Sequence, residues 1–197
     1  MADTSNQAAR RLFLQAAAGL ALPMMAQSEE LSEASSMMLD GAELEPGKPG
    51  DFDFLHGEWR INHRRLKDPS NNQWDVFEGE ATCWSILNGI ASIEELRIPS
   101  RQFSGMGLRI LDGEKKLWSD FWVNSKSGVL TAPGVTGGFK NGVGIFISEE
   151  VEQEKTILAR GMWGNISRDT CRWQQAVSTD GGQSWQDNWI MDWRRVA

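Results

Sequence analysis

Hydrophobic and polar residues alternate along short segments that begin near Asp51 and continue to the C-terminus. In residues 105–111 the side chains of Met106, Leu108 and Ile110 share one face of an extended strand, and the opposite face carries Gly105, Gly107 and Arg109. This period of two residues predicts β-strands. It shows which residues share a face of a strand, but it does not show which face lines the interior.

Ten segments of this kind follow one another. The predicted strands cover residues 58–66, 74–84, 90–98, 105–111, 116–123, 129–136, 143–149, 155–163, 170–178 and 185–195. Clusters of glycine, asparagine, aspartate and proline separate them, and Ser104-Gly105 and Gly137-Gly138 are among the predicted turns. No helical period longer than two turns occurs after residue 51, so no helices are available for crossover connections. The sequence therefore predicts an all-β fold, a single antiparallel up-and-down barrel of about ten strands whose closure removes exposed sheet edges.

The chain before this region has a different character. Residues 1–26 have the pattern of an export signal, in which Arg10-Arg11 resembles a twin-arginine motif and the apolar run that follows is too short to span a bilayer comfortably. The alternative is an amphipathic helix of a cytosolic protein. Residues 27–50 are acidic and rich in serine, which predicts a linker and leaves 51–197 as the folded domain. We expect an exported protein, periplasmic or extracellular, with no stable membrane span after signal cleavage.

Composition narrows the range of partners. The net charge is −7 over 197 residues, and there is no basic stripe, so nucleic acid is not an expected partner. All ten tryptophans follow residue 51, so the large apolar anchors belong to the predicted barrel. The composition does not indicate an oligomeric state.

One local motif, Ser178 to Trp185, fits the S-x-D-x-G-x-[ST]-W pattern known as an Asp box. In such a box the carboxylate, here Asp180, caps backbone N–H groups of a tight hairpin, and a glycine supplies a positive φ. Propellers repeat the box once per blade, but this chain has one copy and no internal repeat. We therefore expect a structural hairpin and not a catalytic site.

The order of several motifs carries a family resemblance. They are DFDFLHGEW at residues 51–59, the paired Trp118 and Trp122, Gly161-Met162-Trp163, Arg172-Trp173-Gln174-Gln175 and the closing Asp box. On these motifs the stretch Asp51 to Arg195 resembles an uncharacterised bacterial domain family grouped with the calycins, the superfamily of lipocalins, fatty-acid-binding proteins and nitrobindins.

The resemblance implies two structural features and a cavity. Trp59, in its Gly-x-Trp motif, is expected to plug one end of the barrel, with Arg194 or Arg195 of the last strand stacked across its ring. Calycin barrels hold small, mostly apolar molecules in the lumen. Nitrobindin-like barrels bind haem through a histidine late in the chain, whereas this chain has no histidine after His63. We therefore predict no cofactor, with haem as the less favoured alternative.

Charged residues inside apolar strand segments are the first candidates for a binding site. Glu94 and Arg109 are of this kind, and if they face the lumen they would be desolvated, as binding and acid–base groups often are. His63 is expected to form an acid–base pair with Glu94 across adjacent strands. The alternative is that each of these residues faces solvent.

Aromatic and amide residues complete the candidate site, with ordinary core packing as the alternative for each. The predicted ligand-binding residues are His63, Glu94, Arg109, Trp122, Trp163 and Gln175. They support a barrel that binds a small apolar or aromatic molecule. The alternative is a cofactor-free isomerase, cyclase or hydratase that uses His63, Glu94 and Arg109.

Other chemistry has little support in the sequence. There is no G-x-S-x-G motif for a nucleophilic serine. Cys83, Cys171, His56 and His63 lack the close paired spacing of a metal site, so no metal is predicted. We expect the two cysteines to be separate thiols, and a disulfide between them is the alternative for an exported protein.

Overall fold

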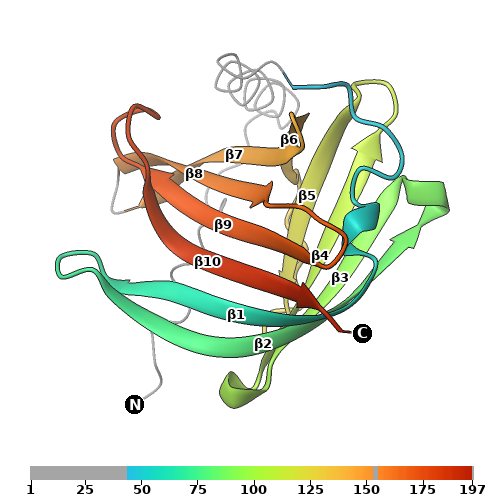
Figure 1. Ribbon diagram of the computed structural model, residues 1–197. Coiled ribbons are helices and arrows are strands. Elements are labelled where there is room, and N and C mark those ends of the chain that lie inside the picture. The colour runs from blue at the N-terminus through green and yellow to red at the C-terminus, as the bar shows by residue number, and fades with distance from the viewer. Residues whose placement is uncertain (1–43, 153–154, 197) are drawn as a thin grey trace.

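The computed structural model describes residues 44–152 and 155–196, and these form ten strands and three short 3₁₀ helices (Figure 1). The predicted export signal and most of the predicted linker lie outside the described residues. The strands are β1 (Gly57–Asp68), β2 (Gln73–Ile86), β3 (Ala91–Ile98), β4 (Phe103–Asp112), β5 (Leu117–Asn124), β6 (Val135–Lys140), β7 (Val143–Glu152), β8 (Lys155–Gly164), β9 (Thr170–Ser178) and β10 (Gln186–Arg195). The helices are η1 (Asp53–Leu55), η2 (Leu87–Gly89) and η3 (Pro99–Arg101).

The strands form one closed antiparallel barrel in which each strand pairs with its neighbours in sequence. The last strand, β10, returns to pair with the first, β1 (Figure 1). In this pairing Trp59 lies opposite Arg195 and Arg65 lies opposite Trp189. This closure confirms the predicted all-β up-and-down barrel. Within the described residues, no helix has the length and apolar character needed to cross a membrane.

Two predicted turns were wrong, and a predicted strand was shifted as a result. Gly105 lies inside β4, and Gly137-Gly138 lies inside β6, which begins at Val135 and not at residue 129. Packing explains these glycines better than turn geometry does. A Cβ on Gly137 would lie 2.2 Å from the backbone carbonyl oxygen of Ile145 and 2.5 Å from the Phe146 ring, so the position must be glycine for the neighbouring strand and the ring to pack against it.

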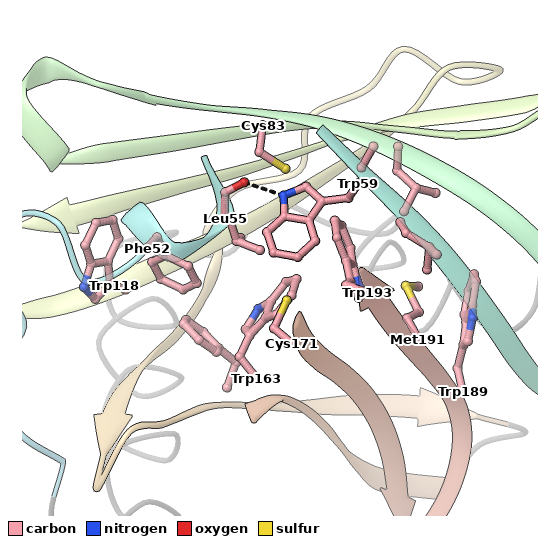
Figure 2. Packing of buried hydrophobic residues seen from close by; sticks show 14 of the residues in the cluster. Phe52, Leu55, Trp59, Cys83, Trp118, Trp163, Cys171, Trp189, Met191 and Trp193 are labelled. Atoms are coloured by element: carbon pink, nitrogen blue, oxygen red, sulfur yellow. Dashed lines mark hydrogen bonds between the residues drawn. The ribbon is translucent and has the colours of Figure 1, made fainter. Parts of the chain in front are cut away.

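One end of the barrel is closed by the short helix η1 together with the start of β1 (Figure 1). The indole N–H of Trp59 donates a hydrogen bond of 2.7 Å to the carbonyl of Leu55 (Figure 2). The Arg195 guanidinium lies 4.3 Å from the centre of the Trp59 ring. This confirms that Trp59 plugs one end and assigns the stacked guanidinium to Arg195. Arg195 also donates to the carbonyls of His56 and Phe54, which fixes the last strand to the plug.

The residues before η1 pack against the same end of the barrel. Glu45 N–H donates to the carbonyl of Phe139 at 2.8 Å, and Gly47 N–H donates to that of Lys116 at 2.7 Å. The Asp51 carboxylate accepts a hydrogen bond of 3.1 Å from the indole of Trp118. The part of the predicted linker that the structure describes therefore lies across β5 and β6.

The Asp box forms the hairpin between β9 and β10, as predicted. The Asp180 carboxylate accepts hydrogen bonds from the hydroxyl of Ser178 and from both the backbone and the hydroxyl of Ser184. Gly181 and Gly182 have φ of 71° and 88°, the conformation that glycine permits. The bonds from Ser184 and Ser178 lower the pKa of Asp180 to about 2.

Candidate binding site in the barrel lumen

The inner face of β4 is the one that carries Gly105, Gly107 and Arg109, so Met106, Leu108 and Ile110 point outward. Gly105, Gly107, Arg109 and Leu111 are buried or line the lumen, whereas Ile110 is 40% exposed. The interior of this barrel is therefore partly polar. That arrangement reverses the usual preference for an aliphatic core face, and it places a guanidinium in the lumen.

The guanidinium is paired inside the barrel. Arg109 Nη2 donates to a carboxylate oxygen of Glu94 at 2.6 Å, and its Nε lies 3.5 Å from Asp120 in an ion pair. Glu94 is 2% exposed and Arg109 is 4% exposed. Burial opposes the charge on Arg109, but Asp120 and Glu94 outweigh it and raise the pKa of the guanidinium. Glu94 and Arg109, for which a solvent-facing position was the alternative, thus form a desolvated ion pair.

Glycine on β4 allows this pair to form. Glu94 lies directly opposite Gly107 in the register between β3 and β4. A Cβ on Gly107 would approach both the Arg109 guanidinium and the Glu94 carboxylate at 3.1 Å, closer than most Cβ contacts. Two residues earlier on the same strand, a Cβ on Gly105 would lie 2.1 Å from the indole of Trp122. Trp122 therefore packs over that glycine.

Aromatic side chains form most of the remaining wall. The lumen contains a cavity of about 40 Å³. Its lining residues are Glu94, Arg109, Asp120, Phe121, Trp122, Trp163, Trp173, Gln175, Met191 and Trp193. The ring of Trp193 makes edge-to-face contacts with Trp59 and with Trp163, with ring centres 5.9 Å and 5.4 Å apart, and so connects the plug to the cavity wall (Figure 2).

Several donors on this wall have no acceptor. No described residue accepts a hydrogen bond from the indole N–H of Trp163, the indole N–H of Trp193 or Nη1 of Arg109. All three side chains are at least nine-tenths buried. Because a buried donor without an acceptor is costly, such groups mark sites where something else accepts the bond.

His63 belongs to a different part of the lumen, and the expected pairing with Glu94 across adjacent strands was wrong. Strand β2 lies between the strands that carry them, β1 and β3. The His63 ring stacks on Phe77 with centres 4.6 Å apart, and its Nδ1 accepts a hydrogen bond from Trp189 at 3.2 Å. His63 is fully buried but does not line the cavity.

The same contacts make His63 a poor haem ligand. Its Nδ1 already accepts the Trp189 hydrogen bond, and its Nε2 lies where a Cβ on Gly79 would approach to 2.5 Å. An iron ligand needs a ring nitrogen with open space in front of it. The position of His63 therefore does not fit haem, and no step of the function below uses one.

Five lining residues were absent from the predicted set, and they are Asp120, Phe121, Trp173, Met191 and Trp193. Residues 116–123 also alternate, and this alternation puts Asp120 on one face with Trp118 and Trp122. Trp173 and Gln175 likewise share a face of β9. Parity showed which residues share a face of each strand, but it identified lining residues only once the structure showed which face is the inner one.

The cysteines lie in the core near the plug (Figure 2). Cys83 and Cys171 are both buried and both free, as expected. Burial is the largest cause that raises the pKa of each thiol, to about 12 for Cys171, with the Glu94 carboxylate as a further cause. Both thiols are therefore protonated at neutral pH and are poor nucleophiles.

Two other kinds of site have less support in the structure: a second hollow and a metal site. A hollow of about 200 Å³ lies near the junction of β1, β9 and β10, and its wall includes the surface ion pair of Arg172 and Asp192. That pair is more than one-third exposed on each side, so the hollow is a solvated groove. Among residues 44–152 and 155–196, no three His, Cys, Asp or Glu side chains come together as a metal site requires.

Comparisons with known proteins leave the family open. No family model matches the sequence, and no curated protein matches it. A solved structure of a protein of unknown function from the DUF3598 family of Nostoc punctiforme PCC 73102 is similar at 12% identity and a TM-score of 0.42. The similarity covers 78% of this chain and 51% of that one, so this chain spans about half the length of that protein. The ten-stranded closed barrel itself fits a calycin-like fold.

Proposed function

We propose that this protein binds a small apolar or aromatic molecule in the lumen of its barrel. The supporting observation is that one cavity, half of whose lining residues are aromatic, is lined by five of the six residues expected to bind a ligand. These five are Glu94, Arg109, Trp122, Trp163 and Gln175. Aromatic walls with a few polar groups of fixed position are typical of small-molecule sites.

The size of the cavity limits the ligand. About 40 Å³ is enough for on the order of three water molecules, so a whole aromatic ring does not fit without movement. Phe121, Trp122 and Trp173 line the cavity but are only partly buried, and they therefore form its route to the surface. A larger ligand enters by rotation of these side chains, and this proposal requires that they move.

Native mass spectrometry of protein purified from its own host tests the proposal. We expect a complex heavier than the chain that releases a small molecule on denaturation. Met191→Phe adds bulk to the cavity wall and should reduce the bound fraction. The matched control is Met162→Phe, because Met162 alternates with the buried Gly161 and Trp163 and so faces away from the lumen. A host-purified protein with no retained ligand, and with no binding of added apolar compounds, would contradict the proposal.

We also propose that the protein acts outside the cytoplasm, on the basis of the twin-arginine-like sequence in residues 1–26. Cell fractionation of the host should find a shortened chain in the periplasm or medium. Replacing Arg10 and Arg11 by lysine should retain the full-length chain in the cytoplasm. Equal distribution of both forms would argue against this export route.

A second candidate function is acid–base catalysis without a cofactor. The observation that favours it is a pair of carboxylates, Glu94 and Asp120, on the wall of one cavity with Arg109 between them. His63 has no part in it. If the protein is an enzyme, small molecules extracted from the host should change on incubation with it, and Glu94→Gln should abolish that change while leaving ligand retention measurable.

A further inference from the structure

The unpartnered donors of the cavity define the chemistry of the group that they meet. Nη1 of Arg109 and the indole nitrogens of Trp163 and Trp193 are N–H groups, and none of them can accept a hydrogen bond. They belong to three strands, β4, β8 and β10, and they line the same cavity. An oxygen with lone pairs satisfies them, whereas a purely apolar group leaves all three unsatisfied.

The charges around this site exclude most ionised groups. Arg109 is the cation of the cavity wall, and it faces two carboxylates, Glu94 at 2.6 Å and Asp120 at 3.5 Å. A bound anion would add a third negative charge beside that single positive one. A bound cation would compete with Arg109 for the carboxylates and could not accept from the indoles. An uncharged acceptor avoids both penalties.

The dimensions place the acceptor at the end of the ligand. A volume of about 40 Å³ admits a group of a few atoms. The partly buried Phe121, Trp122 and Trp173 lie where the rest of the molecule would extend, and their rings suit an apolar body.

We propose that the lumen recognises molecules with one small uncharged oxygen acceptor, such as a ketone, aldehyde or amide carbonyl, at the end of an apolar or aromatic body. The carbonyl oxygen lies among Arg109, Trp163 and Trp193. This inference rests on the proposed function, because it names the class of ligand that the same cavity binds.

Four probes of similar shape test the head group. They are acetophenone, isopropylbenzene, benzoate and benzylammonium, each titrated into the ¹⁵N-labelled protein. Indole N–H resonances report on individual tryptophans, and each is assigned from its Trp→Phe variant. Acetophenone should bind at least tenfold more tightly than isopropylbenzene, and more tightly than either ion. It should shift the resonances of Trp163 and Trp193 but not that of Trp59, whose N–H is bonded to Leu55.

Variants separate recognition from packing. The Trp163→Phe/Trp193→Phe double variant keeps two aromatic rings but loses two donors, so the preference for acetophenone over isopropylbenzene should fall by at least threefold. Each single variant should show part of that loss. Trp84→Phe is the matched control, because Trp84 lies on the outer surface and is 42% exposed. A dispersed Trp59 resonance in every variant shows that the barrel has folded.

Each outcome has one meaning. A carbonyl preference that the double variant weakens supports the inference. Equal binding of acetophenone and isopropylbenzene would overturn it and leave the proposed apolar-binding function standing. Tightest binding of benzoate or benzylammonium would overturn the claim that the head is uncharged. If none of the four probes binds, and the host-purified protein retains no molecule, the proposed function itself fails.

Discussion

Two arginine–tryptophan clusters lie next to each other in this barrel, and they differ in how their polar groups are satisfied. In the closed-end cluster, Trp59 donates to Leu55, and Arg195 stacks on Trp59 while it donates to backbone carbonyls. In the lumen cluster, made of Glu94, Arg109, Trp163 and Trp193, one guanidinium nitrogen and both indole nitrogens have no acceptor among the described residues. The Arg109 guanidinium lies 5.1 Å from the centre of the Trp163 ring.

The comparison shows how the same residue types serve two roles. The closed-end cluster completes its own hydrogen bonds, so its contribution is to the stability of the barrel. The lumen cluster leaves buried donors open, which lowers stability unless an external group accepts from them. This contrast separates the plug from the proposed binding site without reference to any other protein. The following five predictions test it, from the largest expected effect to the smallest.

Replacing Arg109 by methionine should cost about 3–5 kcal/mol of unfolding free energy, because Glu94 then remains buried without its partner. Urea unfolding measures the change. The Glu94→Met/Arg109→Met double variant should recover a large part of the loss, since it removes both charges from the lumen. A single variant that is no less stable than the double variant would show that the pair is not desolvated as the structure has it.

Replacing Arg195 by alanine should cost about 2–3 kcal/mol, because carbonyls near the plug lose a charged donor and Trp59 loses its stacked guanidinium. The side chain is 26% exposed, so water replaces part of what is lost. Arg194→Ala is the control. The Arg194 side chain faces outward, so we expect its removal to change the unfolding free energy by no more than about 0.5 kcal/mol in the same assay. Ligand retention should be unchanged in both variants.

Gly105→Ala should cost about 1–3 kcal/mol, because the new methyl group would overlap the Trp122 ring at the side of the cavity. The near-ultraviolet circular dichroism of the indoles should also change as Trp122 moves. Gly113→Ala provides the comparison, since no atom lies within 4 Å of its Cβ position. A wild-type melting temperature for Gly105→Ala would mean that Trp122 does not pack over this glycine.

Trp59→Phe should destabilise the barrel by about 1 kcal/mol more than Trp193→Phe. The first substitution leaves the buried carbonyl of Leu55 without its donor, whereas the second removes a donor that has no acceptor among the described residues. Both substitutions replace a fully buried indole by the same smaller ring, so the free-energy cost of the space left behind is nearly the same in the two variants. Equal losses in chemical denaturation would remove the distinction between the two clusters.

The smallest effect concerns the Asp box, a surface hairpin outside both clusters. Hydrogen bonds from Ser184 and Ser178 hold the pKa of Asp180 at about 2, below its ordinary value of 3.8. A lowered folded-state pKa means that its stabilising contribution is present above pH 3.8 and is lost as the pH falls toward 2. Carbon-detected NMR titration should show this pKa. Asp180→Asn should flatten the stability curve between pH 2 and 4, and an unshifted titration near 3.8 would contradict the hydrogen-bonded box.

A family resemblance implied the plug by Trp59. The sequence by itself determined the fold class, the approximate strand boundaries and the Asp-box hairpin. These features depend on local signals, namely a period of two residues and turn residues at fixed offsets. The strand from residue 129 was misplaced because glycine has two uses. In Gly137 and Gly105 it leaves room for an aromatic ring, and a local pattern does not distinguish that from a turn.

The tertiary structure alone decided which face of each strand lines the lumen and which side chains meet there. Parity placed Arg109 with Gly105 and Gly107, but only closure of the barrel turned that face inward. The register of β3 against β4 then set Glu94 opposite Gly107 and beside Arg109, while the intervening strand β2 separated it from His63. Pairing across strands depends on contacts between residues that are far apart in the chain, and a pattern of neighbours along one strand does not contain that information.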